Sequence, residues 1–375
     1  MKFDITKPLN KVQSILAAVI VTALAFLVAL IVQKAKDVPL DEATLMRTAG
    51  IRNLQVVGEN LYYLENDGTL RCAQSDGDGV WSVSVSADSN FRATQAGLAV
   101  WRGSKLSIYD RSNGVVVGAY SASDSILDAV VGDTYTAVVV APTNNSKVVI
   151  TNKYGTEVEI IEGFNERTVL ECSFFENRGL FWVMALDSTG TLPSCTVDIY
   201  KPSKKQTGSI SQMDQVFYRV IPRSGQICCV GTDYMSVHDY VGGEKDNQRV
   251  QLYGWTLAAY ESGSDDPLML FAPNAQSEGE IEIRDLRCIR GTKEQMLHLP
   301  VKCSFLACEG DTIYGFSGSK LAVAVYGSHE CNLYSMPVGS DGRPLEVTKL
   351  FGITSDRVAV VRSGSELYLV KLPEE

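Results

Sequence analysis

Nine cysteines and three histidines are the side chains of this 375-residue chain best suited to nucleophilic or metal chemistry. The sequence contains neither C-x-x-C nor H-E-x-x-H, so the spacings of zinc fingers, thioredoxins and zinc proteases are missing. A cysteine in an apolar strand normally behaves as a small buried hydrophobe. We therefore predict no catalytic residue, no metal site and no bound cofactor. The cysteines stand at positions 72, 172, 195, 228, 229, 288, 303, 308 and 331, and the histidines at 238, 298 and 329.

The cysteines also bear on the compartment, because disulfides persist outside the cytoplasm of aerobic cells. If the domain lies there, some cysteines are expected to pair, and we consider Cys303 with Cys308 or Cys172 with Cys195. Unpaired thiols outside the cytoplasm would instead indicate a strictly reducing habitat.

The stretch Asp76–Trp81, with the sequence DGDGVW, is the segment that most resembles a cation-binding loop. Calcium loops end on a further carboxylate, which is missing here, and Asp-Gly pairs are frequent in tight turns. The pattern favours a surface turn in front of a packed Trp81. Gly315–Ser319, with the sequence GFSGS, has the wrong residue order for the G-x-S-x-G turn of serine hydrolases.

A run of apolar residues from Ile15 to Val32 contains Thr22 as its one polar member. At 1.5 Å per residue it spans roughly 27 Å, which is close to the hydrocarbon thickness of a bilayer. Ala23–Ala25 has the small-x-small spacing of a signal-peptidase site, but the apolar run continues beyond it. We therefore predict an uncleaved transmembrane helix at 12–33, preceded by a short cytoplasmic tail at 1–11.

The orientation of this helix is predicted from its flanks. Three lysines precede the apolar run and three basic residues follow it, so the count of positive charges is level. The leading tail is short and basic, and the large domain is rich in Ser, Thr, Gly and Asn. We expect the N-terminus in the cytoplasm, a linker at 34–43, and the domain at 44–372 outside the cell membrane.

After residue 50 the sequence repeats a strand, a tight turn and a second strand. The clearest copies are 61–72, 98–109, 313–324 and 358–370, each with a turn built on residues that tolerate a positive φ. Second strands recur from Leu70 to Leu367 with fainter copies between them, about 42 residues apart, a spacing typical of four-stranded propeller blades. The fold class is therefore predicted as all-β, a β-propeller of about eight blades, with seven as the alternative. The landmarks are Leu70, Leu106, Val149, Val197, Met235, Ile281, Leu321 and Leu367.

The two ends of the chain predict how such a ring closes. The last repeat ends at its third strand, and the segment Glu42–Thr48 precedes the first clear repeat strand. This segment either completes the last blade or is a polar linker. Pairing the first strand with the last would leave no long open edge, which suits a monomeric propeller. Trp81, Trp101, Trp182 and Trp255 are expected to pack between blades.

The charge balance excludes one class of partner. With 34 Lys and Arg against 44 Asp and Glu, the net charge is −10. Nucleic-acid binding needs a basic face that neutralises phosphates. We therefore expect no nucleic-acid partner.

The basic tail, the apolar run, the segment Val38–Glu42 and the repeats together resemble a family of membrane-anchored bacterial propeller proteins of unknown function. The repeats alone, over residues 50–372, resemble quinoprotein-type propellers, including the outer-membrane assembly scaffold lipoprotein. The Gly-x-x-x-Trp docking signature of the quinone-dependent dehydrogenases is not seen. The resemblance thus implies a bacterial envelope protein and assigns no catalytic or cofactor-binding residue.

Two functions from different classes agree with these features. The first is a non-enzymatic, membrane-tethered scaffold that presents the propeller to a protein or cell-envelope partner. Residues 15–32 would anchor this scaffold in the membrane. The alternative is a carbohydrate-active or redox enzyme that works in the central funnel. Two funnel carboxylates roughly 5–10 Å apart would favour a glycosidase. The sequence designates no binding residue for either function.

Overall fold

The computed structural model describes residues 38–374 except for positions 42, 49, 165, 176–178, 214 and 275–281. The predicted tail, the transmembrane segment and most of the predicted linker lie outside the described residues. Within them, no helix is both long and apolar enough to cross a membrane.

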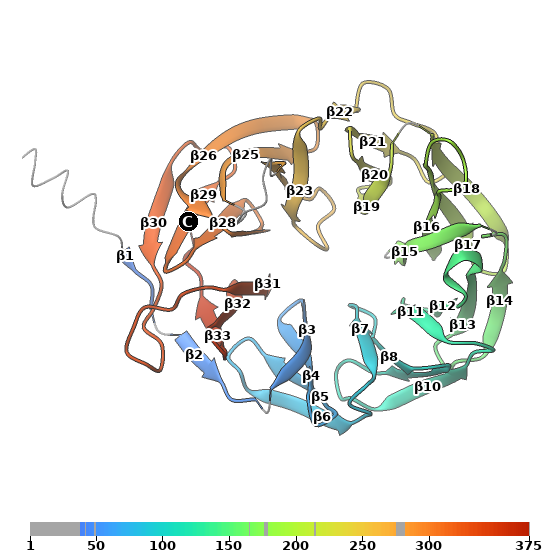
Figure 1. Ribbon diagram of the computed structural model, residues 1–375, viewed down its shortest axis with the longest axis horizontal. Coiled ribbons are helices and arrows are strands. Elements are labelled where there is room, and N and C mark those ends of the chain that lie inside the picture. Colours follow the sequence, from blue (N-terminus) through green and yellow to red (C-terminus); the bar gives the residue numbers. More distant parts are fainter. Residues whose placement is uncertain are drawn as a thin grey trace, which may run out of the picture.

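Eight antiparallel sheets stand around a central axis, which confirms the eight-bladed propeller and excludes the seven-bladed alternative (Figure 1). In blades 1 to 7 the four consecutive strands run from the innermost strand outward, and in blade 8 three consecutive strands do so. The strands of blades 1 to 4 are β3 Ile51–Val57, β4 Asn60–Glu65, β5 Thr69–Gln74 and β6 Gly79–Ser84; β7 Asn90–Ala93, β8 Leu98–Arg102, β9 Lys105–Tyr109 and β10 Val116–Ser121; β11 Ile126–Val131, β12 Tyr135–Val140, β13 Lys147–Asn152 and β14 Glu157–Ile161; and β15 Arg167–Phe175, β16 Leu180–Asp187, β17 Ser194–Lys201 and β18 Lys205–Gln212.

Blades 5 to 8 repeat this order. A 3-10 turn, η1 Thr143–Asn145, lies between β12 and β13 of blade 3. The strands of blades 5 to 8 are β19 Phe217–Arg223, β20 Gln226–Gly231, β21 Tyr234–His238 and β22 Val250–Gln251; β23 Trp255–Tyr260, β24 Met269–Pro273, β25 Ile283–Arg290 and β26 Lys293–Cys303; β27 Phe305–Glu309, β28 Thr312–Ser317, β29 Lys320–Val325 and β30 Cys331–Ser335; and β31 Lys349–Ile353, β32 Val358–Ser363 and β33 Glu366–Lys371.

The repeated hairpins of the sequence form the second and third strands of their blades. Seven of the eight landmark residues lie on a third strand, for example Leu70 on β5 and Leu321 on β29. The eighth, Ile281, lies outside the described residues. Gly103 and Gly318 take φ values of 56° and 54° in their hairpin turns, a conformation that disfavours other residues.

The ring closes as the paired-ends prediction requires. Strand β2, Ala43–Met46, pairs antiparallel with β33 and supplies the outer strand of blade 8. A second, shorter strand, β1 Val38–Pro39, lies in the range predicted as a linker. It pairs parallel with β30 as a fifth strand on the outer edge of blade 7 (Figure 1). The chain therefore enters the propeller through the edges of two neighbouring blades.

The hydrophobic core is divided among the junctions between blades. The buried side chains form eight clusters, and each cluster joins residues of two adjacent blades. Trp101 packs with Ile126 of the next blade, and Trp182 packs with Phe217 in the same way. Sheets stacked face to face need such bulky side chains on their alternating positions.

Glycines let the outer strands approach the turns of the following blade. A Cβ on Gly114 would lie 2.7 Å from the ring of Trp81, whose indole N–H donates a hydrogen bond to the Arg111 carbonyl at 2.9 Å. Gly77, in the Asp-Gly turn predicted from the sequence, packs in the same way against Leu369 and Thr44 of blade 8. The predicted surface turn before Trp81 is therefore part of the packing between blades.

Candidate functional site

The inner strands surround a central channel. Two adjoining cavities, of about 400 Å³ and 580 Å³, share Val56, Tyr260 and Ser262 in their walls. Their combined lining includes residues from all eight blades. We refer to the first as the apolar cavity and to the second as the mouth cavity, because turns between first and second strands line the second one.

Four charged side chains form an arc along one side of this channel. They come from the inner strands of four consecutive blades: Arg92 on β7, Asp128 on β11, Glu171 on β15 and Arg219 on β19. Arg92 Nη1 lies 2.6 Å from Asp128 Oδ2, and Arg92 Nη2 lies 3.8 Å from Glu171 Oε1. Arg219 Nη1 donates to Glu171 Oε1 at 3.1 Å. Glu171 thus lies between two guanidinium groups.

The local strand geometry directs three of these side chains. A register shift occurs just before Asp128, Glu171 and Arg219 in the pairing of each inner strand with its neighbour. Such bulges turn the following side chain away from the regular alternation of a strand. The recurrence of the bulge explains how the charges of successive blades meet on the channel wall.

Apolar side chains lie on the opposite side of the channel, in a wall whose exposed surface is mixed polar and apolar. Beside Arg219, the lining of the apolar cavity comes mainly from the inner strands of blades 6, 7 and 8. Its side chains include Leu257, Leu306, Leu350, Phe351 and Ile353. The channel therefore has the charged arc on one side and these apolar side chains, with Glu309 among them, on the other.

Glu309, at the end of β27, is the carboxyl group in the wall of the apolar cavity. Burial, together with the nearby charge of Glu261, raises the pKa of Glu309, and Arg357 opposes this rise. The same burial raises the pKa of the neighbouring Cys308 thiol. Burial therefore disfavours the charged form of both groups.

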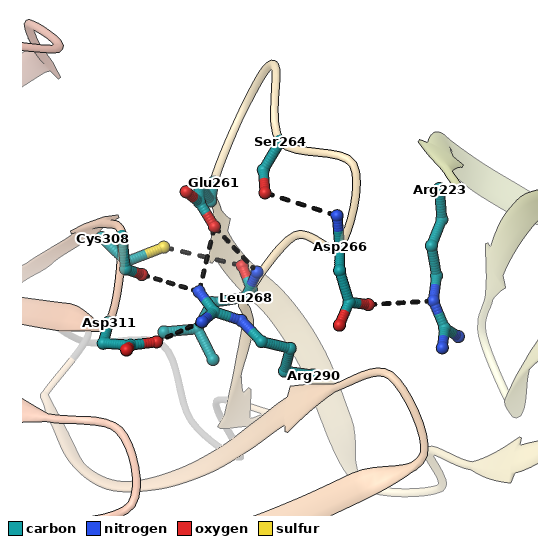
Figure 2. A network of polar contacts seen from close by, with 9 residues as sticks. Arg223, Glu261, Ser264, Asp266, Leu268, Arg290, Cys308 and Asp311 are labelled. Carbon is teal, nitrogen blue, oxygen red and sulfur yellow. Dashed lines mark hydrogen bonds and ion pairs between the residues drawn. The ribbon is translucent and has the colours of Figure 1, made fainter.

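An arginine cluster fixes the loop that joins β23 to β24 at the edge of the channel. Figure 2 shows Arg290 between Glu261 and Asp311, with Arg290 Nη2 at 3.0 Å from Glu261 Oε2. On the other side of the loop, Arg223 Nε lies 3.1 Å from Asp266 Oδ1 (Figure 2). Blades 5, 6 and 7 thus hold this loop, whose residues Ser262 and Gly263 line the channel.

The channel charges are arranged as an ion-pair network. Asp128 and Glu171 both lie beside Arg92, which offsets their charge. A glycosidase instead needs one carboxyl group that is protonated and a second that acts on the sugar. Among the described residues, no group of three or more His, Cys, Asp or Glu side chains is placed to hold a metal ion.

No disulfide joins any of the nine cysteines, and eight of the nine are buried. The two disulfide pairs considered from the sequence are therefore wrong. Cys172 and Cys195 belong to different core clusters, on opposite faces of the blade 4 sheet. Cys303 and Cys308 share one cluster, but their thiols point to the carbonyls of Val301 and Leu268. Burial explains why the pKa of Cys228 rises to about 11.

Each histidine has a separate environment. His238 is buried in blade 5, where its ring nitrogens lie 2.8 Å from Ser236 Oγ and 3.2 Å from the Gly242 carbonyl. Burial lowers the pKa of His238. His298 is exposed and pairs with Asp285, and His329 is also exposed. The histidines do not meet in one site.

Sequence reasoning did not find the charged arc. A signal was present for Arg92 and Asp128, because each is the one charge inside a short strand, NFRA and ILDAVV. The strands of Glu171 and Arg219 each carry a second charge. A charge within a strand that packs on both faces indicates a special position. The signal becomes specific only when the strands are aligned by blade.

Comparison with known proteins supports the fold. No family model and no curated protein matches the sequence. Among solved structures, the C-terminal WD40 domain of Sif2 is similar, with a TM-score of 0.60 and 9% identity. Sqt1 from Saccharomyces cerevisiae has a TM-score of 0.58 and 9% identity, and the computationally designed Ika8 protein has 0.55 and 12%. Each match covers 90% of this chain and 100% of the other.

The chain has a WD40-like β-propeller fold. Its four-stranded blades and its closure by a strand from the opposite end of the chain belong to the same architecture. At these levels of identity the likeness establishes the fold, and function has to be argued from the site.

Proposed function

We propose that this protein is a non-enzymatic, membrane-tethered interaction scaffold on the extracytoplasmic side of a bacterial cell membrane. The observation that carries the proposal is the double attachment of the N-terminal segment. Strands β1 and β2 fasten residues 38–46 to the outer edges of blades 7 and 8. A pull on the preceding chain is therefore distributed over two blades.

The sequence supplies the reason for such an attachment. The apolar run ends at Val32, and β1 begins at Val38. This short separation would hold the wall formed by blades 7 and 8 close to the membrane. It agrees with the proposed kinship to membrane-anchored bacterial propellers.

Exposed apolar side chains on the outer wall support the scaffold function. Val116 on β10 is 50% exposed, and Ile160 on β14 is 42% exposed. These outer strands belong to neighbouring blades. The backbone N–H of Ala119, on β10, donates a hydrogen bond to the carbonyl of Tyr154, in the turn before β14, at 3.4 Å. An apolar surface shared by these two strands would be a site for protein association. WD40-like propellers commonly act as protein-interaction scaffolds, which agrees with this arrangement.

The tether is tested by fractionation of cells that produce the full chain. We expect the protein to stay with membranes after an alkaline wash and to be cut by protease added to spheroplasts. A matched variant that lacks residues 1–33 is expected in the soluble fraction. Full-length protein in the soluble fraction, or a propeller protected from protease, would contradict the proposal.

The scaffold function is tested by affinity purification from gently solubilised membranes, followed by mass spectrometry. We expect one identified envelope protein in stoichiometric amount. Its recovery should fall in a Val116→Lys, Ile160→Lys double variant and persist in Met213→Lys, which changes another exposed side chain (74% exposed). Recovery of the propeller alone would argue against a scaffold.

A further inference from the structure

The charged arc and the apolar side chains of the central channel meet at Arg219. The apolar cavity measures about 400 Å³, which is within the range of small-molecule sites. Its wall combines the Arg219 guanidinium with leucine, isoleucine and phenylalanine side chains from blades 6 to 8. A ligand that fits this wall needs an anionic group and an apolar body.

The arginines, and not their carboxylate partners, line the cavities. Arg219 lines the apolar cavity and Arg92 lines the mouth cavity, whereas Asp128 and Glu171 appear in neither lining. Within the described part of the chain, Arg219 uses only Nη1 for hydrogen bonds, although a guanidinium carries five N–H donors. The Nε and Nη2 donors of Arg219 therefore remain for a ligand.

The ion-pair network can accommodate a second anion. Glu171 lies near both guanidinium groups. It therefore stays paired with Arg92 when a ligand also binds to Arg219. Arg219 is also held by Tyr260, whose ring centroid lies 6.0 Å from the guanidinium carbon. Arginine suits this role because its planar donors bind a carboxylate through two hydrogen bonds.

Two acidic residues in the cavity walls would repel an anionic ligand. Glu309, at the end of β27, lines the same cavity, so the carboxylate of a ligand has to bind on the Arg219 side of it. Asp133 lies in the wall of the mouth cavity, among turns of blades 1 to 4. A compact carboxylate bound at Arg219 does not have to approach Asp133.

We propose that the apolar cavity binds a small organic acid, with its carboxylate on Arg219 and its apolar body against Leu257, Leu306 and Phe351. This inference goes beyond the scaffold function, since a scaffold needs no ligand in its channel. Binding is expected to be non-covalent and to involve no chemical step.

Fluorine NMR of three soluble probes tests the proposal on the full-length protein in nanodiscs. The probes are 4-fluorophenylacetate, 4-fluorophenethyl alcohol and 4-fluorophenethylamine, which share one ring and differ in charge. We expect the resonance of the acid to broaden strongly, that of the alcohol weakly, and that of the amine not at all. Equal broadening of acid and amine, or none for the acid, would overturn the proposal.

Three variants locate the site. Arg219→Gln is expected to weaken binding of the acid by about tenfold or more, in line with the loss of a charged hydrogen-bonding partner. Ala258→Trp fills the cavity from an exposed position and should abolish binding while leaving the charges in place. Arg102→Gln removes an exposed ion pair with Asp88 and serves as the control. Unchanged binding in folded Ala258→Trp would also overturn the proposal.

Discussion

Gly155 of blade 3 lies against the backbone carbonyl of Ala119 in blade 2, so closely that a Cβ at position 155 would overlap it. Gly155 also has a φ of 87°, which disfavours any other residue. Gly242 meets Ser209 in the same way between blades 4 and 5. The outer rim of the propeller is therefore held by backbone contacts as well as by apolar cores.

The first prediction concerns this contact. Gly155→Ala should destabilise the protein through backbone strain and through displacement of β10. The control is Gly103→Ala, because Gly103 has a φ of 56° but no atom within 4 Å of its added Cβ. We expect Gly103→Ala to cost about 1–2 kcal/mol of unfolding free energy. Gly155→Ala should cost about 1–3 kcal/mol more than that. Both free energies of unfolding are measured by urea denaturation. Equal losses in the two variants would show that the contact between Gly155 and Ala119 is unimportant.

The second prediction concerns closure of the ring. Removal of residues 1–47 deletes β2 and exposes the edge of β33, whereas removal of residues 1–40 deletes β1 and keeps β2. An open edge is a template for pairing with another chain. Size-exclusion chromatography should find the shorter deletion monomeric and the longer one aggregated or unfolded. A stable monomer without β2 would show that the pairing of the ends is dispensable.

The third prediction concerns the thiols. Because none of the nine cysteines is in a disulfide, nine thiols should react with a thiol reagent after unfolding without a reductant. In the native protein one thiol should react rapidly, that of Cys331, which is the cysteine not fully buried. Burial raises the pKa of the other eight thiols, that of Cys288 to about 12. Cys331→Ser should remove the rapid phase, and seven reactive thiols in the unfolded chain would instead reveal a disulfide.

Much of the fold could be predicted from the sequence, because a propeller repeats a local pattern. The hairpin from Leu98 to Tyr109 is encoded by adjacent residues, and its copies revealed the period. The outer strand at 43–46 could be predicted because the last repeat lacked one. The predicted membrane helix at 12–33 and the domain limits stay predictions.

The channel could not be predicted in the same way. Arg92 meets Asp128 across 36 positions, and Arg219 meets Glu171 across 48. Their meeting depends on bulges in the inner strands, and a bulge depends on pairing with the neighbouring strand. The turn at Gly77 likewise gains its role only from contact with blade 8. Such features follow from register and ring closure, which local periodicity does not encode.

The last prediction uses the raised pKa of Glu309. A carboxyl group whose pKa is higher in the folded than in the unfolded state binds more protons when folded, so its contribution to stability falls as the pH rises. Ionised Glu309 therefore opposes folding at neutral pH, chiefly because it is partly buried and secondly because Glu261 is near. Glu309→Gln should raise the midpoint of urea unfolding at pH 7, and the gain should shrink as the pH falls toward the ordinary range of a glutamate, about 4.3. Glu346→Gln, at an exposed position, is the matched control and should show no such trend. A gain for Glu309→Gln that is independent of pH would mean that packing, and not ionisation, governs this side of the channel.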